Sequence, residues 1–398
     1  MENAATRLKP LFLLDPSITF LNHGSFGACP AEVLEAAQRW QREMERNPVE
    51  FQSRRSAGLL REAREALGAL LGTAAANLVF MPNATTAVNT VIQSLPLAAG
   101  DEILTMDHEY GACEAAWDHV AGRVGARRVA VPVPLPFDAA GFTERIWSAV
   151  TPRTRVLFLS HLSSQSALIF PIAELIRRAR EAGIVSVIDG AHVPGQLPLD
   201  LDALGADFYA GNCHKWLCAP KGAAFLYARP ERQALLHATT ISWGYHAGRA
   251  GDRSQDAYLG ETPFERRLQW QGTRDITPWL SVPAAIDFQR RHGWDAVRAD
   301  CHARAVRLLE RACALTGLAP IGRPDDFGQM VPIPVPAMDG AALKARLFDE
   351  FRIEVPVTSH GGQLFVRASF QGYNGDADAD ALLDALATIY RLAPRQAR

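Results

Sequence analysis

Lysine is nearly absent from this sequence, although positive charge is not. The 398 residues contain 41 basic side chains, and only four of these are lysines: Lys9, Lys215, Lys221 and Lys344. Arginine therefore carries almost all of the positive charge of the chain. A lysine that is kept in an apolar segment is a candidate for chemistry that specifically needs an amine.

Other absences exclude whole classes of protein. No stretch approaches the roughly 18–20 apolar residues that a membrane span needs, and the first ten residues lack the pattern of a signal peptide. The net charge of −2, without a basic block, argues against nucleic acid as a partner. The six cysteines have no zinc-type spacing, so we expect no metal site and reduced thiols in a cytoplasmic protein.

Short apolar segments alternate with helix-length segments in the first two thirds of the chain. We expect strands at residues 78–81, 102–106, 127–133, 155–160, 184–188, 208–210 and 223–227. This alternation predicts an α/β fold with a doubly wound, mainly parallel sheet between helices. We expect an N-terminal arm at 1–20, a large domain at 21–280 and a smaller α+β domain at 281–398.

Helical spacing and end signals predict several helices. We expect them at residues 31–46, 56–71, 277–291, 295–316, 340–351 and 376–392. The small domain should also contain strands at 329–334 and 364–369. The pattern loosens from 229 to 275, where residues 242–245 and 248–251 are expected to form ordered loops.

Lys215 lies in an unusual place for a charged amine. It stands in Gly211-Asn212-Cys213-His214-Lys215-Trp216, directly after a short strand that is expected to be buried. Burial disfavours the ammonium form and lowers the pKa, and an amine so tuned attacks carbonyls to form a Schiff base. The alternative, a surface lysine on a loop, stays open on this evidence alone. The other nearby lysine, Lys221, is expected in a solvated turn.

Asp189 ends a β-branched run at residues 183–189, which is typical of a parallel strand buried on both faces. Ligands of open α/β sheets bind at the carboxyl ends of the strands. A carboxylate there can hold a protonated ring nitrogen. Pyridoxal 5′-phosphate needs both groups, a lysine for the Schiff base and an acid for its pyridinium nitrogen.

These motifs resemble one known family. Asp189-Gly190-Ala191-His192 and Asn212-Cys213-His214-Lys215 resemble the class V aminotransferases, which are fold type I pyridoxal phosphate enzymes. The segments 21–27 and 271–275 are similar to its isopenicillin N epimerase-like branch. The resemblance implies a seven-stranded sheet with one antiparallel strand, which we place at 223–227, and a homodimer.

The cofactor's phosphate is expected at the start of a helix near Ala84, Thr85 and Thr86, because a helix N-terminus offers free N–H groups and a partial positive charge. We expect Thr85 or Thr86 to be the first residue of that helix; ordinary capping is the alternative. The resemblance adds His214 and Asn212 to the phosphate site. It also implies that Thr273 reaches the phosphate of the neighbouring subunit.

The cofactor ring has further contacts in the resembling family. A ring that stacks on the pyridine is expected at His108, with Tyr110 as the rival, and either is a candidate catalytic acid opposite Lys215. His192 matches the residue that contacts the phenolic oxygen. Ser164 lies where many relatives have asparagine.

Substrate contacts are expected from two segments. Arg367, on an expected buried strand, resembles the arginine that binds the α-carboxylate through a bidentate fork. The resemblance also implies that Asn22, His23, Gly24 and Ser25 lie near the substrate. Arg54 and Arg55, by contrast, are expected on a solvated helix face.

The reaction is predicted to take place at the α-carbon of an amino acid, with Lys215 removing the proton. Epimerisation is the main hypothesis; a C–S lyase and an aminotransferase are the alternatives. A persulfide-forming desulfurase is disfavoured because no cysteine follows Cys313. Outside this family, we considered a non-catalytic binding module and a metal hydrolase built on Asp189, His192 and His214, which would leave Lys215 without a role.

Overall fold

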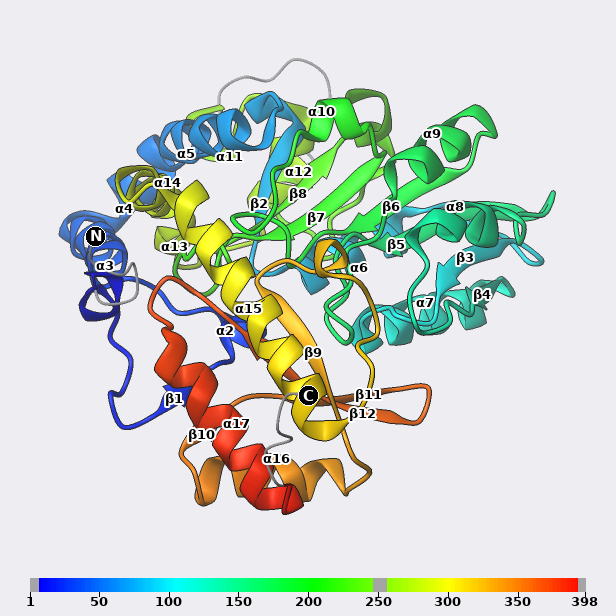
Figure 1. Cartoon of the computed structure of the whole chain (residues 1–398). Coiled ribbons are helices and arrows are strands. Elements are labelled where there is room, and N and C mark those ends of the chain that lie inside the picture. The colour runs from blue at the N-terminus through cyan, green and yellow to red at the C-terminus, as the bar shows by residue number, and fades with distance from the viewer. Residues whose placement is uncertain (1–6, 246–255, 393–398) are drawn as a thin grey trace.

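The seven strands expected in the first two thirds of the chain form one sheet in the computed structural model, which describes residues 7–245 and 256–392 (Figure 1). The loop expected at 248–251 lies outside the described residues. In sheet order the strands are β2 (Leu78–Met81), β8 (Ala224–Ala228), β7 (Phe208–Asn212), β6 (Val185–Asp189), β5 (Thr154–Ser160), β3 (Glu102–Met106) and β4 (Arg127–Val131).

Strand β8 alone runs against the others in this sheet. It pairs antiparallel with both β2 and β7, while the remaining pairs are parallel. The predicted α/β fold, with its antiparallel strand at 223–227, is thus confirmed. The register places Ser160 beside Asp189 and Asp189 beside Ala210, so the carboxyl ends of three neighbouring strands meet at one edge.

Alternation along the strands gives the sheet two buried faces. In β2, Val79 packs in the cluster of helices α6 (Ala84–Ser94) and α7 (Gly111–Val124), whereas Phe80 packs in the larger cluster on the other face. That larger cluster includes residues of α5 (Ser56–Leu71), α8 (Ala139–Trp147) and α9 (Ala173–Glu181). Helices on both faces are what a mainly parallel sheet requires.

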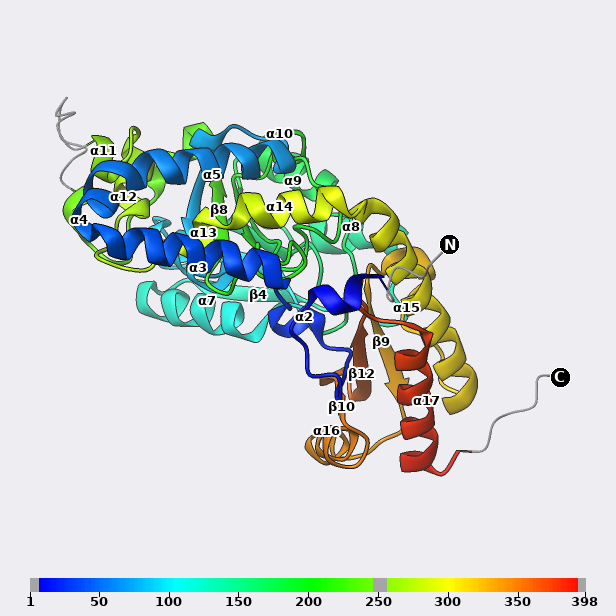
Figure 2. The ribbon, with the colours of Figure 1, turned by 90° about the vertical axis from the view of Figure 1, so that its left-hand side faces the viewer.

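The C-terminal part of the chain forms a smaller group of strands and helices beside the large sheet (Figure 2). Three antiparallel strands, β11 (Val357–His360), β12 (Gln363–Ser369) and β9 (Met330–Val335), form a sheet near α15 (Trp294–Thr316), α16 (Gly340–Asp349) and α17 (Asp376–Tyr390). The N-terminal arm joins this part of the molecule, because β1 (Thr19–Phe20) pairs with β10 (Ile353–Glu354). The division at residues 20 and 280 stays a prediction.

One expected helix is broken. The segment 277–291 forms α13 (Thr277–Leu280) and α14 (Val282–Arg291), because Pro283 has no N–H to donate to the carbonyl of Trp279. The other helices are α2 (His23–Phe26), α3 (Ala31–Arg46), α4 (Pro48–Glu50), α10 (Leu201–Leu204), α11 (Asp256–Leu259) and α12 (Pro263–Gln269). Within the described ranges, no helix combines the length and the apolar character that crossing a bilayer requires.

Candidate active site

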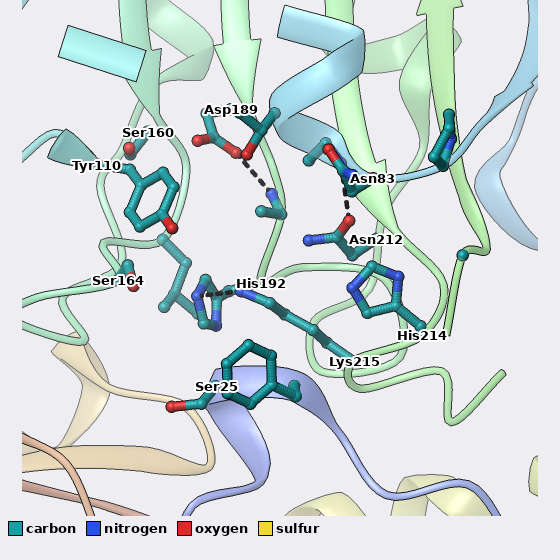
Figure 3. Close-up of a pocket in the computed structure, with 17 residues that line it drawn as sticks. Ser25, Asn83, Tyr110, Ser160, Ser164, Asp189, His192, Asn212, His214 and Lys215 are labelled. Carbon is teal, nitrogen blue, oxygen red and sulfur yellow. Dashed lines mark hydrogen bonds between the residues drawn. The ribbon is translucent and has the colours of Figure 1, made fainter. Parts of the chain in front are cut away.

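A cavity of about 380 Å³ lies at the edge of the sheet where β5, β6 and β7 end (Figure 3). Ten residues predicted from the sequence line it: Ser25, Ala84, Thr85, Tyr110, Ser164, Asp189, His192, Asn212, His214 and Lys215. The sequence reasoning had given no role to seven others: Phe26, Pro82, Asn83, Ser160, Leu162, Ala191 and Gly222. Of the segment predicted to lie near the substrate, Ser25 is the member that lines the cavity.

Lys215 follows β7 and extends its amine into the cavity (Figure 3). Its Nζ lies 2.9 Å from Nε2 of His192. Burial and, to a smaller extent, the positive charge of Arg367 lower the pKa of Lys215 to about 7, although the negative charge of Asp189 opposes both. Near neutral pH a large fraction of this amine is therefore unprotonated, which is the form that attacks a carbonyl.

Asp189 ends β6 and is only 5% exposed. One carboxylate oxygen accepts the N–H of Ala191 at 2.9 Å, and the other accepts the thiol of Cys113 at 3.6 Å. Burial raises the pKa of Asp189. No cationic side chain among the described residues forms an ion pair with it, so this carboxylate lacks a positive partner.

The helix N-terminus at the other end of the cavity belongs to α6. Asn83 caps it, accepting the N–H of Thr86 at 2.8 Å, so the expectation that a threonine starts the helix was wrong by one or two residues. The N–H of Ala84 donates to Oδ1 of Asn212 at 2.8 Å. The Thr86 hydroxyl donates to Oδ1 of Asn83 at 3.0 Å, and Thr86 does not line the cavity. Thr85 does line it.

His214 lies beside this helix end. Its Nδ1 is 2.9 Å from the carbonyl oxygen of Ala223, and since a carbonyl only accepts, Nδ1 carries a proton. Burial lowers the pKa of His214 to about 4. The ring is therefore neutral near pH 7, and its Nε2 is a bare acceptor until a proton is added.

Arg367 on β12 is a buried guanidinium without an acid. It is 4% exposed, and it donates to the carbonyl of Ser164, to the Ser164 hydroxyl at 3.2 Å and to the Ser25 hydroxyl at 3.3 Å. Its Nε has no partner, and no carboxylate of the described chain pairs with it. Burial lowers its pKa to about 10. Arg367 does not line the cavity itself, but it contacts Ser25 and Ser164, which do, and a buried cation without an acidic partner among the described residues is a site for an anion.

The structure does not bring His108 to the cavity. Its ring is fully buried, with Nδ1 2.9 Å from the Ser166 hydroxyl and Nε2 3.0 Å from the Val133 carbonyl, and it stacks on His360 at 3.8 Å between centroids. Tyr110, the rival prediction, lines the cavity and is 43% exposed. His108 therefore lies outside the cavity, and of the two predicted rings Tyr110 is the one that lines it.

Asn22, His23 and Gly24 lie behind the cavity instead of lining it. The ring of His23 is buried between the Tyr373 hydroxyl, 2.9 Å from Nδ1, and the Lys215 carbonyl, 3.0 Å from Nε2. Asn22 donates to Glu354 at 3.3 Å and accepts the Ser25 hydroxyl at 2.5 Å. His23 and Asn22 support the backbone and side chains of the site, and the predicted nearness of this segment to a substrate stays a prediction.

Thr273 is exposed and does not line the cavity of its own chain. Its predicted role concerns a neighbouring subunit and stays a prediction. Arg55 pairs with Glu43 at 2.5 Å, outside the cavity, as expected for a solvated helix face.

Glu109, which lies between His108 and Tyr110 in the sequence, was not predicted as a residue of the site. It is 1% exposed and accepts the Ser160 N–H at 3.1 Å and the Ser160 hydroxyl at 2.5 Å. Burial, with a smaller contribution from the charge of Asp189, raises the pKa of Glu109 to about 8. Asp189, which lines the cavity, and Glu109, which contacts the lining residue Ser160, are therefore two buried carboxyl groups without a cationic partner among the described residues.

The metal-hydrolase hypothesis finds no support in the geometry. Among the described residues, the one group whose ligand atoms approach closely enough for a metal is Asp107, His108 and His360, and none of them lines the cavity. The ligand atoms of Asp189, His192 and His214 do not converge in this way.

Comparison with known proteins agrees with this geometry. The family model of class V aminotransferases matches residues 20–382. The chain belongs to the class V aminotransferase family. It is 41% identical to the isopenicillin N epimerase of Streptomyces clavuligerus, covering 94% of this chain and 95% of that protein. It is 29% identical to a putative L-cysteine desulfhydrase of Oryza sativa, covering 94% of this chain and 83% of that protein.

A solved complex between the cystine C–S lyase C-DES and its reaction product, cysteine persulfide, has the same fold. It superposes with a TM-score of 0.80 at 23% identity and covers 94% of this chain and 98% of that one. Class V members are pyridoxal 5′-phosphate enzymes, and this chain is one of them. Its residues fit the cofactor: an amine of lowered pKa, an unpaired buried carboxylate and a helix N-terminus enclose one cavity.

Proposed function

We propose that this chain is an amino-acid epimerase or racemase of the isopenicillin N epimerase-like branch, with pyridoxal phosphate bound to Lys215. The bound cofactor supplies an electron sink for negative charge at the substrate's α-carbon. Asp189 would hold the pyridine nitrogen, and His192 the phenolic oxygen. The end of α6 near Thr85, together with His214 and Asn212, would hold the phosphate.

Arg367 would bind the substrate's α-carboxylate, because it is a buried cation that pairs with no carboxylate among the described residues. Its contacts with Ser164 and Ser25, which line the cavity, would fix the plane of the guanidinium and so the orientation of the α-carbon. Lys215 Nζ would then take up the α-proton on its side of the substrate.

One observation carries the choice of epimerisation. Lys215 and Tyr110 enter the cavity from different sides, and both end in a group that can hold a proton (Figure 3). Inversion requires a donor on the face opposite the base, and Tyr110 Oη would return the proton there. The relatives' names favour the same reaction.

A C–S lyase is the second candidate, favoured by the likeness to cysteine desulfhydrases. None of the six cysteines lines the cavity, which argues against a persulfide-forming desulfurase but not against a lyase without a thiol. An aminotransferase remains the third possibility within the family.

Incubation of the enzyme with single amino acids in deuterated water separates these reactions. Deuterium at the α-carbon with inversion of configuration supports the epimerase, and Tyr110→Phe should then slow inversion much more than exchange. Pyruvate and sulfide without inversion would establish the lyase, and amine exchange with a keto acid would establish the aminotransferase.

We also propose a cytoplasmic homodimer in which Thr273 completes the phosphate site of the neighbouring subunit. The exposed position of Thr273 and the absence of a disulfide among the described cysteines support this. Mixed dimers of Thr273→Ala and Lys215→Ala chains should regain activity, because one of their two sites has both residues. A monomer in sedimentation, or no recovery in mixed dimers, would contradict the proposal.

A further inference from the structure

His192 is a buried imidazole whose two nitrogens both contact other nitrogens. Its Nε2 lies 2.9 Å from Lys215 Nζ, and its Nδ1 lies 3.3 Å from Nε1 of Trp216. The ring is 2% exposed. The positions of its protons therefore decide which of these contacts are hydrogen bonds.

The direction of the hydrogen bond between Trp216 and His192 follows from the chemistry of the indole. An indole N–H is a donor and never an acceptor, so Nδ1 of His192 must accept. Burial lowers the pKa of His192 well below its usual value, and the positive charges of Lys215 and Arg367 lower it further, so the ring is neutral. A neutral imidazole carries one proton, which must then be on Nε2.

The contact with Lys215 follows from this. If Nε2 carries the proton, then Lys215 Nζ must accept it with its lone pair, which only the unprotonated amine can do. In the reverse arrangement an ammonium donates to Nε2, the histidine proton moves to Nδ1, and two N–H groups face each other across 3.3 Å. That arrangement is disfavoured.

We propose that Trp216 is a positioning residue, which fixes His192 as an Nε2–H donor and thereby favours the free amine of Lys215. The same N–H would then be available to the phenolic oxygen of the cofactor. That last step rests on the proposed function, whereas the proton positions are a property of the chain itself.

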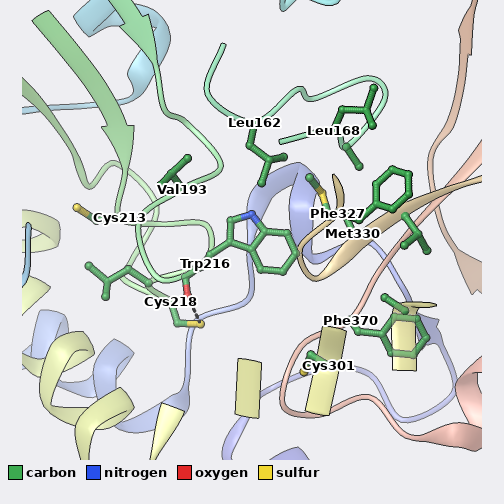
Figure 4. Packing of buried hydrophobic residues seen from close by; sticks show 14 of the residues in the cluster. Leu162, Leu168, Val193, Cys213, Trp216, Cys218, Cys301, Phe327, Met330 and Phe370 are labelled. Atoms are coloured by element: carbon green, nitrogen blue, oxygen red, sulfur yellow. Dashed lines mark hydrogen bonds between the residues drawn. The ribbon is translucent and has the colours of Figure 1, made fainter. Parts of the chain in front are cut away.

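Packing and a backbone hydrogen bond fix the position of the Trp216 indole. Figure 4 shows its indole among Leu162, Val193 and Met330, and its carbonyl accepts the side-chain amide of Gln289 at 2.7 Å. A Cβ added at Gly24 would lie 2.4 Å from the Met330 sulfur and 3.4 Å from the indole. Gly24, predicted near the substrate, thus makes room for this packing.

The tautomer of His192 can be measured directly in the full-length, cofactor-free chain. Imidazole ¹⁵N shifts of labelled histidine, with His192 assigned through His192→Gln, should show a protonated Nε2 and a bare Nδ1. A proton on Nδ1, or a charged ring at neutral pH, would overturn the proposal.

The scarcity of lysine makes the second measurement simple. Labelling lysine with ¹³C at Cε gives signals from four residues, and Lys215→Ala identifies the signal of interest. The other charged and titratable groups around Lys215 and His192 are Arg367, Asp189, Cys113, His214 and His23. Lys215 should titrate near the value of about 7 that burial gives it.

Trp216→Phe removes the indole N–H and frees His192 to accept from an ammonium. The pKa of Lys215 should then rise by about one pH unit, the size of one lost hydrogen bond. Replacement of Trp216 by 3-benzothienylalanine, which keeps the shape and lacks the N–H, should give the same shift, and it decides the matter if the phenylalanine variant fails to fold.

Trp117→Phe is the matched control. Trp117 is also fully buried, but its indole nitrogen has no partner among the described residues. This change should therefore leave the pKa of Lys215 unchanged. An unchanged Lys215 pKa in the benzothienyl variant would refute the role of Trp216. Failure of the proposed epimerase reaction would instead appear in the deuterium assay and would leave both NMR results standing.

Discussion

Replacing Arg367 by glutamine should lower activity without lowering stability. The guanidinium is buried and pairs with no carboxylate of the described chain, so the folded protein carries the cost of a lone cation. Bound substrate would offset that cost through two charge-assisted hydrogen bonds of about 1.5–3 kcal/mol each. Their loss should lower kcat/KM roughly 10²- to 10⁴-fold.

The same change should leave the Tm unchanged or raise it, because an uncompensated charge is removed from the interior. It should also raise the pKa of Lys215, which the charge of Arg367 helps to lower. In the cofactor-free chain the ¹³C signal of Lys215 should therefore titrate at a higher pH. The assays are α-hydrogen exchange for kcat/KM, and this titration and thermal unfolding of the cofactor-free chain.

Arg64 provides the control, since it is equally buried but pairs with Glu265 at 2.7 Å. Arg64→Gln leaves Glu265 unpaired and should cost about 3–5 kcal/mol of stability, without a specific loss of kcat/KM in the protein that folds. If Arg367→Gln instead lowered the Tm strongly and left kcat/KM nearly intact, Arg367 would be a structural residue and the assignment would fail.

Two further predictions concern pH. His214 has its pKa lowered to about 4 and needs a proton on Nε2 to donate to phosphate, so the affinity for inorganic phosphate should fall as pH rises above about 4, and His214→Ala should weaken this dependence; an unchanged slope in that variant would exclude His214. Glu109 has its pKa raised from 4.5 to about 8, so the folded state keeps a proton that the unfolded state releases, and stability should fall as pH rises between these values. Glu109→Gln should remove that fall in a denaturant titration, and equal slopes in both proteins would refute the raised pKa.

Much of the large sheet could be predicted from the sequence because its strands are buried on both faces. Such strands are continuous apolar runs bounded by turns, and all seven predicted ones are present. The two-residue strands β1 and β10 were missed because each pairs with a segment more than 300 residues away, and two residues carry no periodicity. The start of α6 was misplaced because three residues that commonly cap helices, Asn83, Thr85 and Thr86, lie within four positions there.

Site residues at the carboxyl ends of strands were predicted correctly to lie in the cavity. Residues in turns were predicted less well, because the conformation of the turn decides which way each side chain points. Asp189 and Lys215 follow from the strands that precede them. His108 and Tyr110 lie in the same turn after β3, and only the packing of that turn directs one ring to Ser166 and the other into the cavity. The link from Trp216 through His192 to Lys215 depends on distances between side chains, which no spacing along the chain encodes.

The central claim is that the amine of Lys215 holds the cofactor beside Asp189. Borohydride reduction of the cofactor-loaded enzyme, followed by peptide mapping, tests it most directly, because only four lysines can carry the label. We predict one pyridoxyl group per chain, on Lys215, and loss of the covalent label in Lys215→Ala. A label on Lys221, or a protein that binds no pyridoxal phosphate at all, would contradict the account.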